Sequence, residues 1–91
     1  MRTLLKEIGD LYTNFTGPVY EAGHLDKKTK ELIAFSNSVI IDCKPCMKVH
    51  LNQALSAGAS EEEINEAVAL AMTVSAGKAR LAAQETINNL G

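Results

Sequence analysis

Hydrophobic residues near the start of the chain recur three or four positions apart, which is the spacing of one helical face. They are Leu4, Leu5, Ile8, Leu11, Tyr12 and Phe15. This spacing predicts an amphipathic helix over the first part of the chain. Gly17 and Pro18 follow directly, and we expect them to end this helix, because proline lacks the amide hydrogen that a helix interior uses.

Two further helices are predicted in the middle of the chain. Asp26 can cap a helix that runs through the segment KKTKELIAFSNSV. Pro45 fits only within the first turn of a helix, where its missing N–H would have no partner in any case. The next helix should therefore begin beside Cys43 and run to about Ala57.

The last third of the chain predicts two more helices. Ser60 and Glu63 have the spacing of a capping box, and the helix that they begin is expected to reach about Val74. Gly77 is expected to separate it from a further helix that ends near Leu90. The prediction is thus an all-α fold, a bundle of about five helices.

The helix that begins at Ser60 is apolar on every side, so every side of it must be covered. Its apolar residues are Ala67, Val68, Ala69, Leu70, Ala71, Met72 and Val74. A chain with two Phe, two Tyr and no Trp has little bulk to surround such a helix. We therefore expect an obligate homo-oligomer in which neighbouring subunits cover one side. The alternative is a central core helix in a monomer.

Composition limits the classes of partner. Residues 1–91 are expected to form a single domain, and a net charge of -2 without any basic block argues against a nucleic-acid partner. The opening MRTLLKEIGD carries charges where a secretory signal needs an apolar core, and no apolar run approaches the roughly 18 residues of a membrane span. We expect a cytoplasmic protein with no membrane partner.

Three residues that can carry chemistry lie along one face of a predicted helix. Cys43, Cys46 and His50 stand at positions i, i+3 and i+7. The first turn of a helix favours a thiolate, because its N–H groups are unpaired and the helix dipole is positive there. An imidazole can take or return a proton near neutral pH. This arrangement indicates a redox-active dithiol with His50 as its base.

Glu31 is expected to join this group. If the two middle helices form an antiparallel hairpin that turns near Asp42, Glu31 lies roughly 16 Å before the turn and His50 roughly 12 Å after it, at about 1.5 Å per residue. The two side chains would then lie in the same layer. The carboxylate could orient the imidazole and stabilise its protonated form.

A metal site is the main alternative from the residues themselves. Cys43, Cys46 and His50 are zinc-type ligands, and Glu31 or His24 could supply a fourth. However, Cys43 and His50 would lie about 10 Å apart along a helix axis, whereas zinc ligands lie at about 2.0 to 2.3 Å from the ion. The stripe therefore favours thiol chemistry over metal binding.

The order Glu31, eleven residues, CKPC, three residues, His50 resembles the signature of the AhpD-like alkylhydroperoxidases in the carboxymuconolactone decarboxylase superfamily. The likeness extends from about Leu25 toward Gly77. The resemblance implies an all-helical fold in homotrimers or homohexamers, and reduction of organic hydroperoxides by the CxxC pair.

The resemblance also implies roles for the site residues. Cys46 would be the peroxidatic thiol, Cys43 the resolving thiol, and His50 with Glu31 a proton relay. Helix position alone does not choose between the two sulfurs. Better-known members carry a further His between the cysteines, where this chain has Lys44 and Pro45, and this difference bears on efficiency and substrate. Lactone decarboxylases of the superfamily generally lack the cysteine pair.

The sequence thus predicts a thiol-dependent peroxidase or disulfide oxidoreductase that cycles between dithiol and disulfide. Without a nucleotide or flavin motif, no cofactor is expected, and an external dithiol such as a lipoyl or thioredoxin-like protein would reduce the disulfide. The alternatives are a non-enzymatic redox sensor or interaction subunit, a decarboxylase of the superfamily, and a metal-binding protein.

Overall fold

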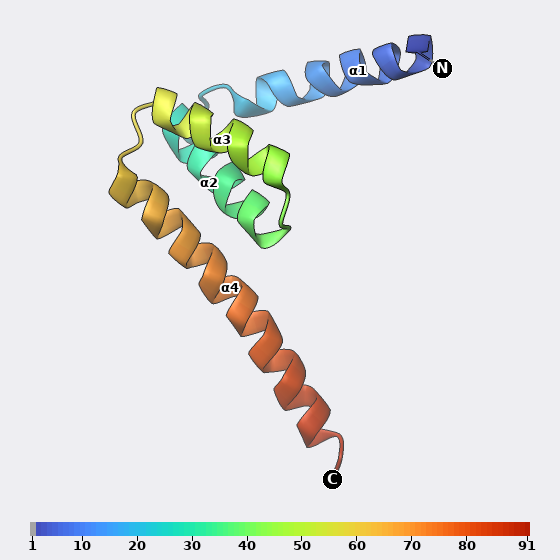
Figure 1. Cartoon of the computed structure of the whole chain (residues 1–91), viewed down its shortest axis with the longest axis vertical. Coiled ribbons are helices and arrows are strands. Elements are labelled where there is room, and N and C mark those ends of the chain that lie inside the picture. The colour runs from blue at the N-terminus through green and yellow to red at the C-terminus, as the bar shows by residue number, and fades with distance from the viewer. Residues whose placement is uncertain (1) are drawn as a thin grey trace.

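The computed structural model describes residues 2–91, and this part of the chain is all-helical, as predicted (Figure 1). Its four helices are α1 (Arg2–Tyr20), α2 (Lys27–Ile40), α3 (Lys44–Ser56) and α4 (Glu61–Asn88). Helix α2 is central, because it packs against α3, α4 and the end of α1. None of these helices combines the length and the apolar character that crossing a membrane requires.

The starts of α2 and α4 follow local capping signals and are confirmed. The Asp26 side chain accepts a hydrogen bond from the Thr29 N–H at 2.7 Å. Ser60 and Glu63 form the predicted capping box, with both side chain to backbone hydrogen bonds present at 3.1 and 2.9 Å. Each bond satisfies an amide that would otherwise lack a partner at the helix end.

Helices α2 and α3 form the predicted antiparallel hairpin, which turns at Ile41 and Asp42. Asp42 has a φ of 53°, a left-handed conformation that Asp tolerates better than most residues. The Cys43 N–H then donates to the Ser38 carbonyl at 3.0 Å. This tight turn places Cys43 directly at the start of α3.

The prediction of about five helices is wrong, because α4 continues through Gly77 to Asn88. A glycine inside a helix costs only about 0.5 to 1 kcal/mol relative to alanine. Between Gly77 and Thr86 the chain has no proline and no Ser, Thr, Asp or Asn that could cap a new helix. The surrounding helix formers therefore outweigh this single residue.

The predicted end of the first helix is also wrong, because α1 includes Gly17 and Pro18 and ends at Tyr20. A proline disfavours a helical conformation at the preceding residue partly through a clash with its Cβ. Gly17 has no Cβ, so this clash is reduced. The extension brings Tyr20 to the region where α1 meets α2 and α3.

The buried core is small and lies where α2, α3 and α4 meet. Phe35, Ala54, Ala59, Ile64 and Ala67 form its main cluster. Helix α1 and the carboxyl-terminal part of α4 project away from this core (Figure 1). Their apolar side chains are exposed to solvent in the single chain, among them Leu4, Leu5, Ile8, Leu11, Phe15, Leu81 and Ile87.

Only one side of α4 is covered by the chain itself. Ala67 and Ala71 are buried, whereas Leu70 and Met72 are each 64% exposed. We predicted that every side of this helix must be covered, and within the single chain only the face toward α2 is covered. The opposite face lacks a partner within residues 2–91.

Candidate active site

Cys43 and Cys46 form a disulfide at the amino end of α3, with their Cα atoms 5.2 Å apart. Cys43 is the N-cap residue of the helix, and its Sγ accepts a hydrogen bond from the Cys46 N–H at 3.3 Å. Pro45 lies in the first turn, where its ring costs no helical hydrogen bond. The turn at Asp42 and this first turn thus hold the two sulfurs together.

Glu31 and His50 lie opposite each other on α2 and α3. The His50 Nδ1 is 2.8 Å from the Glu31 Oε2. Glu31 is only 2% exposed, and its other carboxylate oxygen accepts from the Lys27 Nζ at 3.2 Å. A carboxylate can only accept, so Nδ1 carries the hydrogen and Nε2 is left for exchange with other groups. The hairpin geometry predicted this pair.

Tyr20 is a site residue that the sequence reasoning missed. Its hydroxyl lies 3.4 Å from the His50 Nε2, and the two ring centroids are 5.0 Å apart. Burial, and next the negative charge of Glu31, raise the pKa of the Tyr20 phenol above its ordinary value. No spacing in the sequence relates Tyr20 to His50, because the contact joins different helices.

Lys30 on α2 forms hydrogen bonds to the backbone at the end of α1. Its Nζ donates to the Val19 carbonyl at 2.8 Å and to the Glu21 carbonyl at 2.6 Å. These two carbonyls flank Tyr20 in the sequence. Lys30 therefore positions the backbone that carries the phenol over His50.

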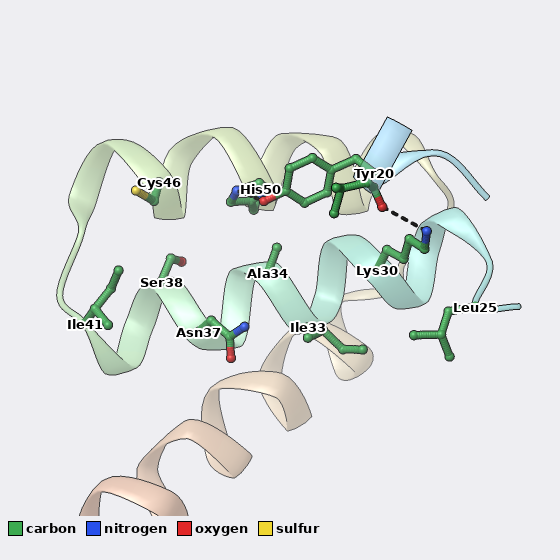
Figure 2. A pocket seen from close by; sticks show the side chains of 11 residues that line it. Tyr20, Leu25, Lys30, Ile33, Ala34, Asn37, Ser38, Ile41, Cys46 and His50 are labelled. Carbon is green, nitrogen blue, oxygen red and sulfur yellow. Dashed lines mark hydrogen bonds between the residues drawn. The ribbon is translucent and has the colours of Figure 1, made fainter. Parts of the chain in front are cut away.

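A cavity of about 470 Å³ opens between α2, α3 and the end of α1 (Figure 2). Figure 2 shows Cys46 and His50 on α3 facing Ser38 and Ala34 on α2. The other lining residues are mostly apolar, and they are Val19, Tyr20, Leu25, Lys30, Ile33, Asn37 and Ile41. The cavity therefore offers an apolar pocket with a sulfur, an imidazole and a phenol along one side.

The structure brings together the four residues that the sequence selected. Cys43 and Cys46 are bonded, and His50, one helical turn beyond Cys46, is paired with Glu31. His24, the other candidate metal ligand, is exposed and does not line the cavity. Within residues 2–91, His, Cys, Asp and Glu side chains form no group of three or more placed to hold a metal ion.

Fold and site together define an all-helical protein with a redox-type CxxC pair. The sequence profile of the carboxymuconolactone decarboxylase family matches residues 6–86. The chain belongs to this family, which agrees with the resemblance that the motif indicated.

A sequence relative is known from Paracoccus denitrificans. An uncharacterised protein of the cox locus of Paracoccus denitrificans is 36% identical over 72 residues, which cover 79% of this chain and 65% of that protein. The chain thus spans slightly less than two thirds of that relative's length.

Solved structures share the fold. A protein from Methanobacterium thermoautotrophicum has a TM-score of 0.84 at 34% identity, covering 93% of this chain and 92% of its own. A carboxymuconolactone decarboxylase family protein from Thermotoga maritima, for which a part in the antioxidative response has been suggested, has a TM-score of 0.71 at 35% identity over 81% of this chain and 68% of its own. A family protein from Legionella pneumophila reaches 0.68 at 31% identity over 96% and 80%.

Proposed function

We propose that this protein is a thiol-dependent peroxidase of the alkylhydroperoxidase type. The observation that carries this proposal is the Cys43–Cys46 pair at the start of α3, beside an apolar cavity that the Glu31-paired His50 also lines. The suggested antioxidative part of the Thermotoga maritima relative agrees with it. A compartment that keeps thiols reduced, the cytoplasm, suits this cycle.

Cys46 is the thiol that attacks in this mechanism, because Cys46 lines the cavity and Cys43 does not. His50 takes the thiol proton, and the Glu31 carboxylate stabilises the positive ring. The thiolate forms an S–O bond to the hydroperoxide as the O–O bond breaks, which gives a sulfenic acid and an alcohol after protonation.

Cys43 completes the oxidative half of the cycle. Its thiol displaces the hydroxyl group of the Cys46 sulfenic acid, which forms the disulfide and releases water. An external dithiol, of lipoyl or thioredoxin-like chemistry, then attacks the disulfide and leaves as a disulfide itself. Such a partner restores both thiols without any cofactor bound to this chain.

Mass spectrometry of the reduced protein before and after one equivalent of organic hydroperoxide tests the proposal. The wild type should lose about two hydrogens as the disulfide closes, Cys43→Ser should accumulate sulfenic acid, and Cys46→Ser should stay nearly unreactive. If instead Cys46→Ser accumulates sulfenic acid and Cys43→Ser stays unreactive, Cys43 is the attacking thiol and Cys46 the resolving thiol.

Turnover separates a peroxidase from a redox sensor. With excess dihydrolipoamide or reduced thioredoxin, a peroxidase consumes many equivalents of hydroperoxide per chain. A protein that oxidises once and shows no sustained consumption with either dithiol would instead be a sensor, and the enzymatic proposal would be wrong.

A further inference from the structure

The hydrogen-bond chain that begins at Lys27 does not end at His50. Lys27 contacts one oxygen of Glu31, the other oxygen contacts the His50 Nδ1, and the His50 Nε2 lies 3.4 Å from the Tyr20 hydroxyl. Nδ1 is occupied by the carboxylate, so Nε2 is the ring atom through which His50 exchanges protons. The atom that faces Nε2 is the phenol oxygen.

Tyr20 is placed to reach a molecule in the cavity. Tyr20, His50 and Cys46 all line the same 470 Å³ space. In Figure 2 the Tyr20 ring comes from the end of α1 and lies beside the His50 ring of α3. A molecule bound against the Cys46 sulfur therefore shares the cavity with the phenol as well as with the imidazole.

A phenol suits this position in both protonation states of the imidazole. A hydroxyl can donate to the lone pair of a neutral Nε2 and can accept from Nε2–H once the ring is protonated. Burial raises the pKa of the Tyr20 phenol, which keeps the hydroxyl protonated and able to donate at neutral and mildly alkaline pH. Lys30 fixes the backbone on both sides of Tyr20.

We infer that the Tyr20 hydroxyl is the proton donor to the oxygen that leaves the hydroperoxide. This inference rests on the proposed peroxidase function and adds a residue to its mechanism. As Cys46 bonds to one peroxide oxygen and the O–O bond breaks, the leaving alkoxide takes the Tyr20 proton. The Tyr20 oxygen then takes the proton on the His50 Nε2, which came from the Cys46 thiol. The net result is one proton lost by the thiol and one gained by the alcohol, with Tyr20 and His50 returned to their starting states.

Tyr20→Phe tests this role, because it removes the hydroxyl and keeps the ring against His50. Tyr12→Phe is the matched control, since Tyr12 lies on the same helix, is 67% exposed and does not line the cavity. The reduced proteins are mixed with tert-butyl hydroperoxide or with peracetic acid, and the rate of thiol loss is followed in a single turnover.

The two oxidants differ in their need for a proton. Attack of the thiolate on tert-butyl hydroperoxide releases tert-butoxide, which must be protonated. Attack on peracetic acid releases acetate, which is stable without a proton at neutral pH. Loss of a general acid should slow the hydroperoxide reaction of Tyr20→Phe by about 100-fold. Its peracetic acid reaction, and both reactions of Tyr12→Phe, should stay within about 3-fold of the wild type.

Two results would overturn the inference: equal slowing of Tyr20→Phe with both oxidants, which indicates a structural effect, or unchanged rates with both. In either case the proposed peroxidase function stands if the wild type still consumes hydroperoxide. If the wild type reacts with tert-butyl hydroperoxide no faster than free cysteine, the proposed function itself fails. Circular dichroism of each variant establishes that the helices are intact.

Discussion

At the scale of single residues, the buried carboxylate of Glu31 is the most demanding feature of the site. A charge that is 2% exposed is strongly destabilising unless it is paired and hydrogen-bonded. Lys27 and His50 supply one partner for each oxygen. Because Lys27 is half exposed while His50 is only 15% exposed, the contact with His50 is the better shielded of the two.

The Glu31→Gln substitution removes the negative charge of the side chain and keeps its size, so it tests what the charge contributes to the reaction. The amide that replaces the carboxylate could still accept from the His50 Nδ1 but could not stabilise a positive ring, so the single-turnover oxidation of Cys46 should slow by about 10- to 100-fold. Stopped-flow measurement with an organic hydroperoxide checks this. Glu7→Gln, at an exposed position of α1, is the control and should match the wild type.

The Tyr20 phenol predicts a change of stability with alkaline pH. Its pKa is raised in the folded protein, so the folded state holds this proton more tightly than the unfolded chain. The resulting stabilisation is complete below the ordinary phenol pKa of about 10 and is lost as the pH rises through the folded value.

Urea unfolding near pH 9 and near pH 11, on either side of the ordinary phenol pKa of about 10, measures this effect. The free energy of unfolding of the wild type relative to Tyr20→Phe should fall over this range. A constant difference between the two proteins would show that folding does not change the affinity of Tyr20 for its proton.

At the scale of helices, the starts of α2, α3 and α4 and the end of α3 near Ala57 could be predicted from the sequence, whereas two other ends could not. Asp26, Cys43 and Ser60 each cap a helix through hydrogen bonds within three residues, so the signal is local. The ends predicted at Gly17 with Pro18 and at Gly77 are wrong. Neighbouring residues override the weak preference of a glycine against a helix, and Pro18 lies in the last turn of α1.

The site residues also divide into those that a local signal relates to one another and one that no local signal reveals. Glu31 and His50 could be paired because both belong to one hairpin whose register follows from its turn. Tyr20 could not be found, because its position depends on how far α1 extends and on the anchoring of its end by Lys30. A contact between separate helices leaves no periodic signal in the sequence.

Gly77→Ala tests how α4 is surrounded. An added Cβ meets nothing within 4 Å in the single chain, so the substitution should stabilise the protein by about 0.5 to 1 kcal/mol through helix propensity. Thermal unfolding followed by circular dichroism measures the change. A loss of stability would mean that another helix approaches Gly77 closely in the assembled protein.

At the scale of the whole molecule, the single chain is much more extended than a compact monomer of its length. Its radius of gyration is 17.3 Å, whereas a compact chain of this length has about 12 Å. It exposes 7191 Å², against about 5,200 Å² for a compact monomer of its mass. The excess is about 2,000 Å², which is of the order of the area that interfaces between subunits bury.

We propose that copies of this chain assemble through α1 and the outer face of α4, as homotrimers or homohexamers. Leu11 is 69% exposed in the apolar face of α1, so Leu11→Lys should shift the assembly toward smaller and less stable species. Sedimentation velocity measures the mass of each species. Asn14→Lys adds the same charge at an exposed polar position of α1 and should leave the assembly unchanged.

If the wild type sediments as a monomer at micromolar concentration, this assembly is wrong. The apolar face of α1 would then need a different partner. If Leu11→Lys and Asn14→Lys lower the mass equally, added charge rather than the apolar contact would be responsible.

The capping role of the Cys43 sulfur connects oxidation state to folding. When Cys43 is deprotonated, as its attack on the Cys46 sulfenic acid requires, its sulfur accepts a hydrogen bond from the Cys46 N–H more strongly than a disulfide sulfur does, so an ordered α3 favours the reduced pair. By thermodynamic linkage, the folded protein should be the stronger oxidant, and its midpoint potential should become more negative when urea unfolds α3. Formation of the first turn of α3 would therefore make the disulfide more reactive toward dithiols.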